Sequence, residues 1–228
     1  MILVILLIIL ILVFLLMYYR KSSYTDVKIF VISIPGSKRR EKVTEEFKKY
    51  NLDFEFFDGV KVENKEYLFS IYDKLDIKYR EYVKPDGQVG VLLAYLSFMK
   101  YAIDNNLDNI LLCEDDITFI PEEVEYFKNN KHEFINKCDW LMVHRSVVDD
   151  GWGIQAQVIS LECAKKMYNI RDLMLERLKD TPIDLLLIWR QIDINVCISD
   201  HLICKHNYNP FDNPMESERL VNNNIDNS

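Results

Sequence analysis

Short apolar runs alternate along this chain with longer segments of helical periodicity, and the alternation limits the folds open to it. Residues 28–34 (KIFVISI) are rich in β-branched side chains and end at Pro35 and Gly36, which is typical of a buried strand followed by a turn. A helix is expected over 38–50 and a second strand over 54–60 (FEFFDGV). This order indicates an α/β sandwich with a mostly parallel central sheet.

The same pattern continues through the rest of the chain. Residues 61–86 are charged and rich in tyrosine, and we expect a loop with a short helix there. Apolar spacing predicts a helix over 90–105, and NILLC at 109–113 predicts another buried strand. Further strands are expected at 139–143 and 155–160, and further helices at 161–170 and 183–192.

The N-terminus carries an uninterrupted apolar run over residues 2–19. As a helix this run would extend about 27 Å, just enough to cross the hydrocarbon core of a bilayer. A cleaved signal peptide is the alternative, but the run has no basic segment before it and no small-residue cleavage site after it. We therefore expect a transmembrane anchor over 1–19, a stalk over 20–27, a folded domain over 28–215 and a disordered tail over 216–228.

Charge and cysteine content bear on location and partners. Arg20 and Lys21 follow the apolar run, so the positive-inside rule favours a cytosolic domain, with a lumenal one as the alternative. An odd set of five cysteines without a CxxC pair agrees with a reducing compartment. The net charge of −8 speaks against a nucleic-acid partner, because nucleic-acid binders are usually basic.

Three consecutive acids, Glu114, Asp115 and Asp116, follow the predicted strand at 109–113. Because side chains alternate across a strand, Glu114 and Asp116 are expected on one side and Asp115 on the other. Carboxylates at this end of a strand suit Mg²⁺ or Mn²⁺, which can bridge a diphosphate, and open α/β sheets bind ligands there. Acids that merely end a strand and cap a turn are an equally weighted alternative. Pairing of these acids with neighbouring bases, or a position far from any cavity, would overturn both the metal site and the function that depends on it.

Three bases follow the first predicted strand in the same way. Lys38, Arg39 and Arg40 stand at the start of a predicted helix, whose N-terminal amides can also receive an anion. A solvated basic face is the ordinary role of such a run. A diphosphate bound between the two strand ends would meet a metal on one side and these bases on the other.

Several segments together resemble glycosyltransferase family 25, which includes bacterial lipooligosaccharide galactosyltransferases and procollagen galactosyltransferases. The match runs in order over most of residues 28–190. The family's opening strand and its Arg-containing turn resemble VISIPGSKRREKV, and its second strand resembles FEFFDGV. The family's "GEIGCxLSH" helix resembles GQVGVLLAYLSFMKYAIDNN, and its acidic metal motif resembles NILLCEDDITF. GIQAQVISLECAKKM and TPIDLLL are similar to two later elements of the family.

This resemblance implies a GT-A-like fold, related to the Rossmann sandwich. It also implies transfer of a hexose, galactose or glucose, from a UDP-sugar to a hydroxyl of a protein or glycan acceptor, with inversion. Metal and diphosphate binding, by Mn²⁺ or Mg²⁺, would fall on Glu114, Asp115 and Asp116.

The resemblance also assigns residues to the rest of the donor site. It places Arg39, Arg40 and Asp58 near the nucleotide and Gly87, Gln88 and Gly90 near the sugar. Asp184 opens a predicted helix and is our candidate general base. In an inverting displacement the base accepts the proton of the acceptor hydroxyl while the metal stabilises the departing diphosphate.

The chain departs from the family pattern at four positions. Val91, Ala94 and Tyr95 stand where the family helix has Cys, Ser and His, and Ser33 stands where its first strand has Asn. These departures leave a non-catalytic GT-A-like binding module open as an alternative function. A metal-dependent phosphate-ester hydrolase is a third, for which a second set of metal ligands is not evident in the sequence.

Overall fold

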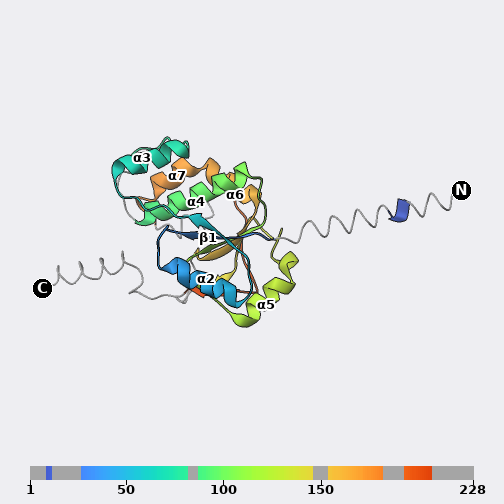
Figure 1. Ribbon diagram of the computed structural model, residues 1–228. Coiled ribbons are helices and arrows are strands. Elements are labelled where there is room, and N and C mark those ends of the chain that lie inside the picture. Colours follow the sequence, from blue (N-terminus) through green and yellow to red (C-terminus); the bar gives the residue numbers. More distant parts are fainter. Residues whose placement is uncertain (1–8, 12–26, 82–86, 146–153, 182–192, 207–228) are drawn as a thin grey trace.

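A central sheet between two layers of other elements organises the computed structural model, which describes residues 9–11, 27–81, 87–145, 154–181 and 193–206 (Figure 1). Among these residues, six strands form the central sheet in the order β2-β1-β3-β7-β5-β8. Their bounds are β1 Ile29–Ser33, β2 Glu55–Asp58, β3 Ile110–Glu114, β5 Trp140–Met142, β7 Ala156–Ile159 and β8 Val196–Ile198. β1 is parallel to β2 and β3, and β5 to β8, whereas β7 is antiparallel to both its neighbours. The sheet is therefore mixed, and the predicted α/β class is confirmed.

Helices cover one face of this sheet. They are α3 (Lys65–Lys74), α4 (Gly87–Asp104), α6 (Leu161–Asn169) and α7 (Arg171–Arg177). The long helix α4 is buried along most of its length and packs with side chains such as Phe30, Leu112 and Trp140 of the sheet. A helix that is apolar on nearly all sides is stable only inside the protein, and α4 accordingly forms the centre of this layer.

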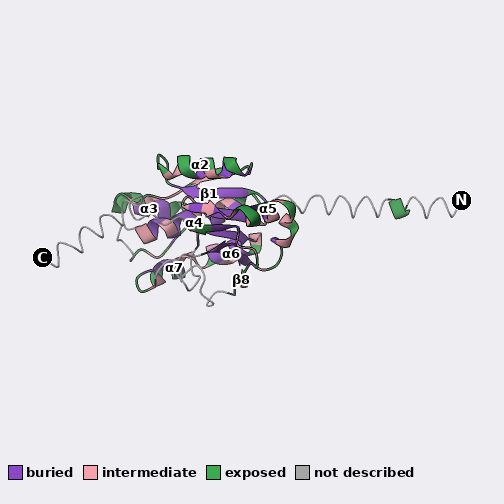
Figure 2. Cartoon of the chain, turned by 90° about the horizontal axis from the view of Figure 1, so that it is seen from below, coloured by how far each residue is buried: buried purple, intermediate pink, exposed green. Residues whose placement is uncertain are grey.

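The opposite face of the sheet is covered by α2 (Arg39–Lys49), α5 (Pro121–Asn129) and a small second sheet. This sheet has the order β4-β9-β6, with β4 Ile117–Phe119, β9 Cys204–His206 and β6 His144–Arg145. A 3₁₀ turn, η1, spans Lys131–Glu133. Figure 2 shows the buried residues along the sheet and on the inner faces of the helices, while the outer face of α2 is exposed.

Most of the predicted elements are present within two or three residues of their expected bounds. The strand expected at 28–34 is β1, the helix expected at 90–105 is α4, and the strand expected at 109–113 is β3. Local patterns do not predict the helices α5 and α7 or the short strands β4, β6, β8 and β9. The helix expected at 183–192 lies outside the described residues.

In the part of the chain that the structure describes, no helix has both the length and the apolar character needed to cross a membrane. Only residues 9–11 of the expected anchor over 1–19 are described, and these three are helical. The anchor therefore stays a prediction. The tail expected over 216–228 also lies outside the described residues.

The order of the strands places a topological switch at β1. The chain passes from β1 through α2 to β2 on one side, and returns through α4 to β3 on the other side. The connecting helices lie on opposite faces of the sheet. In open α/β sheets such a reversal opens a crevice beyond the carboxyl ends of the two central strands, and ligands bind there. Here the crevice lies beyond Ser33 of β1 and Glu114 of β3.

Candidate functional site

Side chains join the carboxyl ends of β1 and β3 at this switch. The hydroxyl of Ser33, which is buried, donates a hydrogen bond of 2.5 Å to Oδ2 of Asp115. Asp115 and Asp116 form the tight turn between β3 and β4. A carboxylate is therefore held at the point where the sheet topology predicts a ligand.

Arg39, the first residue of α2, reaches both carboxylates of this turn. Its Nη1 lies 3.3 Å from Oδ1 of Asp115 and 3.2 Å from Oδ2 of Asp116. The three side chains are only 12–26% exposed, so solvent and salt screen the pairs less than they screen surface pairs. This is the pairing with a neighbouring base that speaks against a preformed metal site, and it involves two of the three acids.

Burial and the oppositely charged neighbours shift the pKa values of Asp115 and Arg39 in opposite directions. Burial raises the pKa of Asp115 above its ordinary value, and the nearby charge of Asp116 adds to the effect, while the Ser33 hydroxyl and Arg39 oppose it. Burial alone would lower the pKa of Arg39, but the carboxylates of Asp116 and Asp115 raise it above its ordinary value. Arg39 thus stays charged and is the counter-ion of the acidic turn.

Glu114 lies on the other side of the sheet from this pair. Its Oε1 is 3.3 Å from the hydroxyl of Tyr95 in α4. The expected alternation is correct for Glu114 and Asp115 but wrong for Asp116, which joins Asp115 at Arg39. The strand ends at Glu114, and the turn that follows rotates Asp116 away from the position that a continued strand would give it.

Arg40 and Asp58 form a second, separate contact at the same edge. Nη2 of Arg40 donates to the carbonyl oxygen of Ser33 at 2.7 Å and to Oδ1 of Asp58 at 2.5 Å. The guanidinium also lies over the ring of Phe56, 4.6 Å from its centroid. Arg40 therefore ties the end of β1 to the end of β2, and its described contacts are structural.

The glycines expected near the sugar lie at the start of α4. Gly87 and Gln88 belong to its first turn, and Gly90 is buried against the chain that follows β2. A Cβ on Gly90 would lie 2.7 Å from the carbonyl oxygen of Val60, so only glycine fits this approach of helix to backbone. The N-terminus of α4 thus lies at the same edge as the acids. Asp184 lies outside the described residues.

A small cavity of about 100 Å³ borders the acidic turn on the α2 side. It is lined by Arg39, Lys42, Val43, Glu46, Asp115, Asp116, Ile117 and Thr118. The volume equals about three water molecules in the liquid, so the cavity has room for a phosphate-sized group or an ion.

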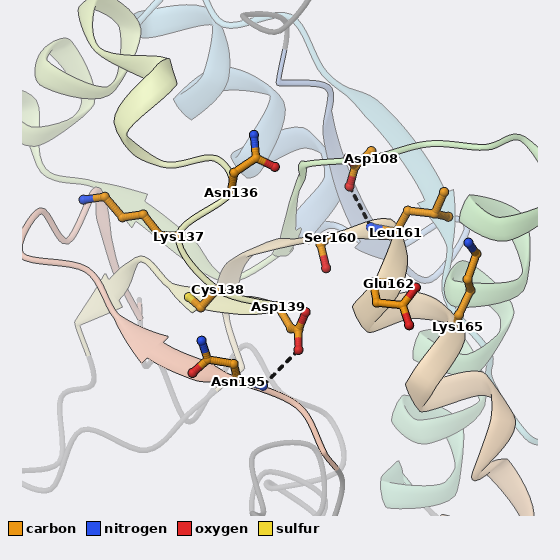
Figure 3. Close-up of a pocket in the computed structure, with 10 residues that line it drawn as sticks. All are labelled: Asp108, Asn136, Lys137, Cys138, Asp139, Ser160, Leu161, Glu162, Lys165 and Asn195. Carbon is orange, nitrogen blue, oxygen red and sulfur yellow. Dashed lines mark hydrogen bonds between the residues drawn. The ribbon is translucent and has the colours of Figure 1, made fainter.

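A larger cavity of about 450 Å³ lies at the opposite edge of the sheet (Figure 3). Two of its three acids are already used by the backbone, since Asp108 accepts from the amide of Leu161 at 2.8 Å and Asp139 from the amide of Asn195 at 3.0 Å. It adjoins the amino end of β3, far along the strand from the acidic turn. We therefore place the candidate site at the smaller cavity, where the charged groups converge.

Beside Arg39, the described residues at the switch offer two carboxylates as oxygen ligands for a metal ion, those of Asp115 and Asp116. Among the described residues, no group of three or more His, Cys, Asp or Glu side chains could hold a metal by itself. Asp115 and Asp116, however, both direct an oxygen towards one cationic group, Arg39. Mg²⁺ is commonly held by one or two carboxylates together with substrate phosphates, and the pair fits a site of that kind.

Three residues of this region have no role that the sequence alone predicts. Ser33 and Tyr95 stand out only as departures from a family pattern, and Gln157 of β7 is not among the candidates. Gln157 is fully buried and donates from Nε2 to the hydroxyl of Tyr95 at 3.0 Å. A polar residue inside a strand of otherwise buried apolar residues, AQVI, is the signal that could have identified it.

Comparisons with known proteins agree on one class. The family model described as glycosyltransferase family 25 (LPS biosynthesis protein) matches residues 26–147. A candidate glycosyltransferase of Haemophilus influenzae is 27% identical in an alignment that covers 83% of this chain and 76% of that protein.

Solved structures of two glycosyltransferases are also similar. One is involved in the glycosylation of the major capsid of PBCV-1, with a TM-score of 0.45, 11% identity, and coverage of 78% of this chain and 94% of that chain. The other is the apo form of GlyE from Streptococcus pneumoniae TIGR4, with a TM-score of 0.44, 11% identity, and coverage of 81% and 55%. The likeness in structure is too low to transfer detail from either protein.

Proposed function

The chain belongs to glycosyltransferase family 25, and we propose that it transfers a hexose, galactose or glucose, from a UDP-sugar to a hydroxyl of a protein or glycan acceptor with inversion. The observation that carries this proposal is the convergence of Ser33, Arg39, Asp115 and Asp116 at the switch between β1 and β3. A nucleoside diphosphate with its metal ion needs a site that carries both positive and negative side chains. Its phosphates are anionic and pair with a cationic group, while the metal ion is cationic and binds to carboxylates.

We assign the diphosphate of the donor to the α2 side of the switch. Arg39 is charged and stands at the start of α2, where the partial charge of a helix N-terminus attracts anions. The amides of Arg39 and Arg40 themselves already donate to Ser37, to its Oγ at 3.2 Å and its carbonyl oxygen at 3.1 Å. When a phosphate enters, Arg39 can exchange one carboxylate for a phosphate oxygen without losing its charge compensation. Arg40 and Asp58 keep the turn between β1 and α2 in place.

Asp115 and Asp116 would hold Mn²⁺ or Mg²⁺ at the diphosphate. A divalent ion there supplies charge neutralisation for the departing UDP. Ser33 keeps the carboxylate of Asp115 oriented through its 2.5 Å hydrogen bond. Asp184 remains our candidate for the base that removes the proton of the acceptor hydroxyl.

The main alternative is a GT-A-like binding module without turnover, suggested by Val91, Ala94 and Tyr95. Ala94 is buried in the core of the α4 layer, but Tyr95 brings a hydroxyl to within 3.3 Å of Glu114. A polar group is thus retained beside the acids, and we prefer the enzyme to the binding module.

The test is incubation of the purified chain with UDP-galactose or UDP-glucose and Mn²⁺, with release of UDP as the signal. An enzyme should release UDP slowly by hydrolysis without an acceptor, and EDTA should suppress the signal. The Asp116→Asn variant should lose turnover. The binding module would be favoured if the chain binds UDP but releases no UDP from either sugar nucleotide, whichever acceptor is supplied. Absence of UDP binding would contradict the proposed donor class.

A further inference from the structure

We infer that Arg39 closes the proposed metal site in the free protein, so that a divalent ion binds well only together with the diphosphate of the donor. This inference rests on the proposed function and concerns the regulation of the same site. It gives Arg39 two partners in turn, the carboxylates of Asp115 and Asp116 before the donor binds and the phosphates afterwards. Arg39 then weakens the binding of the metal ion alone, although it strengthens the binding of the diphosphate.

The guanidinium of Arg39 takes the place that a cation would need between the two aspartates. Its Nη1 donates to Oδ1 of Asp115 at 3.3 Å and to Oδ2 of Asp116 at 3.2 Å. The other oxygen of Asp115 accepts from the hydroxyl of Ser33. Both oxygens of Asp115 and one oxygen of Asp116 are therefore engaged in the free protein. A divalent ion that enters alone must compete with a positive charge that is already bound to these oxygens.

This competition is strong because the charges are shielded from solvent. The side chain of Arg39 is 26% exposed, and those of Asp115 and Asp116 are 12% and 16% exposed. Burial acts to lower the pKa of Arg39, but the carboxylates of Asp116 and Asp115 raise it above its ordinary value. The arginine therefore stays charged, and solvent and salt screen its repulsion of a second cation less than they would at the surface.

Part of the guanidinium remains available to an anion. Both bonds to the aspartates come from Nη1, and among the described residues Nε and Nη2 of Arg39 make no hydrogen bond. The cavity of about 100 Å³ that Arg39 lines together with both aspartates has room for a phosphate-sized group. A phosphate can therefore contact Arg39 while it still bonds the carboxylates, and can then replace them as its counter-ion, because the planar fork of a guanidinium suits phosphate oxygens.

The exchange makes the two ligands cooperative. A phosphate that binds Arg39 releases the carboxylates for the ion, and an ion that binds the carboxylates releases Arg39 for the phosphate. By thermodynamic linkage, UDP must raise the affinity for the ion by the same factor by which the ion raises the affinity for UDP. Direct contact between ion and phosphate adds to this factor in any such site, so the property specific to Arg39 is weak binding of the ion alone.

The test measures binding of Mn²⁺ to the full chain from the electron paramagnetic resonance signal of the free ion, with and without UDP. The Arg39→Gln variant removes the charge and its bonds to both carboxylates. We expect it to bind Mn²⁺ without UDP about tenfold more tightly than the wild type, the usual effect of removing one competing hydrogen bond to a charged group. The factor by which UDP tightens Mn²⁺ binding should fall by about tenfold in the same variant.

Lys38→Gln is the matched control for the loss of one positive charge. Lys38 precedes Arg39 and is exposed, and the bonds to the two aspartates come from Arg39. The affinity of this variant for Mn²⁺ without UDP should stay within about twofold of the wild type, because solvent and salt screen an exposed charge. Arg39→Lys keeps the charge but loses the planar fork, and we expect an intermediate affinity for Mn²⁺ alone. An equal gain in Lys38→Gln and Arg39→Gln would reduce the effect to net charge and would overturn the inference.

Two further results would overturn the inference while leaving the proposed donor class intact. One is an unchanged affinity of Arg39→Gln for Mn²⁺ alone. The other is measured on the wild type, and so serves even if the variants do not fold: it is binding of Mn²⁺ that is equally tight with and without UDP. Failure of the wild-type chain to bind UDP, with or without Mn²⁺, would instead overturn the donor class, and this inference with it.

Discussion

The hydroxyl of Ser33 and the carboxylate of Asp115, 82 residues apart in the sequence, form a 2.5 Å hydrogen bond between the carboxyl ends of β1 and β3. The register of the two strands brings them together, since Ile32 pairs with Glu114 and each next residue extends beyond that pair. Ser33 is buried and Asp115 is mostly so. The bond therefore lies at the topological switch and orients one of the two acids that face Arg39.

Loss of this bond should reduce both stability and ligand binding. Ser33→Ala removes the hydroxyl that donates to the buried carboxylate of Asp115. We therefore expect the free energy of unfolding to fall by about 1–3 kcal/mol. The affinity for UDP in the presence of Mn²⁺ should also fall, because Asp115 is no longer held towards Arg39. Urea unfolding and calorimetric titration measure the two effects. Ser70→Ala, which removes a hydroxyl bonded to the Tyr67 carbonyl within α3, is the control and should leave UDP affinity unchanged.

Arg39 is expected to carry much of the binding energy of the diphosphate. Arg39→Gln removes the positive charge that two carboxylates share, and the affinity for UDP should fall by about tenfold or more, since charge-assisted bonds are the strong ones. Arg80→Gln is the matched control, because Arg80 pairs with Asp73 beside α3, away from the acidic turn. Equal UDP affinities in the wild type and Arg39→Gln would contradict the assignment of the diphosphate to the α2 side.

Gly90 should resist substitution although it lies inside a helix. Alanine is favoured over glycine in helices by about 1 kcal/mol, but a Cβ at this position would lie 2.7 Å from the backbone oxygen of Val60. Backbone atoms cannot move aside as a flexible side chain can, so we expect Gly90→Ala to lower the free energy of unfolding by about 1–3 kcal/mol. Thermal or urea unfolding measures this change. An increase in stability would mean that α4 and the chain after β2 are further apart than described.

The carboxylate of Asp139 makes stability depend on acid pH. It accepts from the amide of Asn195 at 3.0 Å and from the ammonium of Lys166 at 2.9 Å. Burial opposes its ionisation, but these two bonds prevail and lower the pKa of Asp139 below its ordinary value. A carboxyl group with a lowered folded pKa stabilises the protein above its unfolded pKa, about 4, and this contribution disappears as the pH falls through the folded value.

The Asp139→Asn variant tests this dependence. The difference in free energy of unfolding between the wild type and the variant should be constant above about pH 5 and should shrink below about pH 4. Urea unfolding at a series of pH values measures the difference. Asp53→Asn, at an exposed loop position, is the control. A difference that grows as the pH falls would have the wrong sign and would contradict the account of Asp139.

The main elements of the fold could be predicted from local patterns. The five residues of β1 are all buried, and a run of β-branched and aromatic residues such as IFVIS has few other stable environments. The apolar surface of α4 likewise requires a buried helix. By contrast, β4, β8 and β9 have three residues each, too few for a period to be recognised, and they are stable only through partners that lie far away in the sequence.

The candidate site was predicted in part. Reasoning from strand ends placed the acids and Arg39 at the same edge of the sheet, as the structure does. The alternation rule gave the wrong side for Asp116 because it assumes that the strand continues beyond Glu114, where a turn begins. Contacts of Tyr95 with Glu114, Gln157 and the Ile154 carbonyl involve separations of 19 to 62 residues, which a local pattern does not encode.

The sequence by itself determined which segments of this protein are buried strands and helices, and that a basic turn and an acidic turn follow two of the strands. These properties depend on the burial and backbone preferences of neighbouring residues. Only the tertiary structure decided that Arg39 pairs with Asp115 and Asp116 and that Glu114 faces Tyr95 on the other side of the sheet. The physical reason is that strand pairing and helix packing, through contacts between distant residues, set which charged groups share a face and so which ligand each can bind.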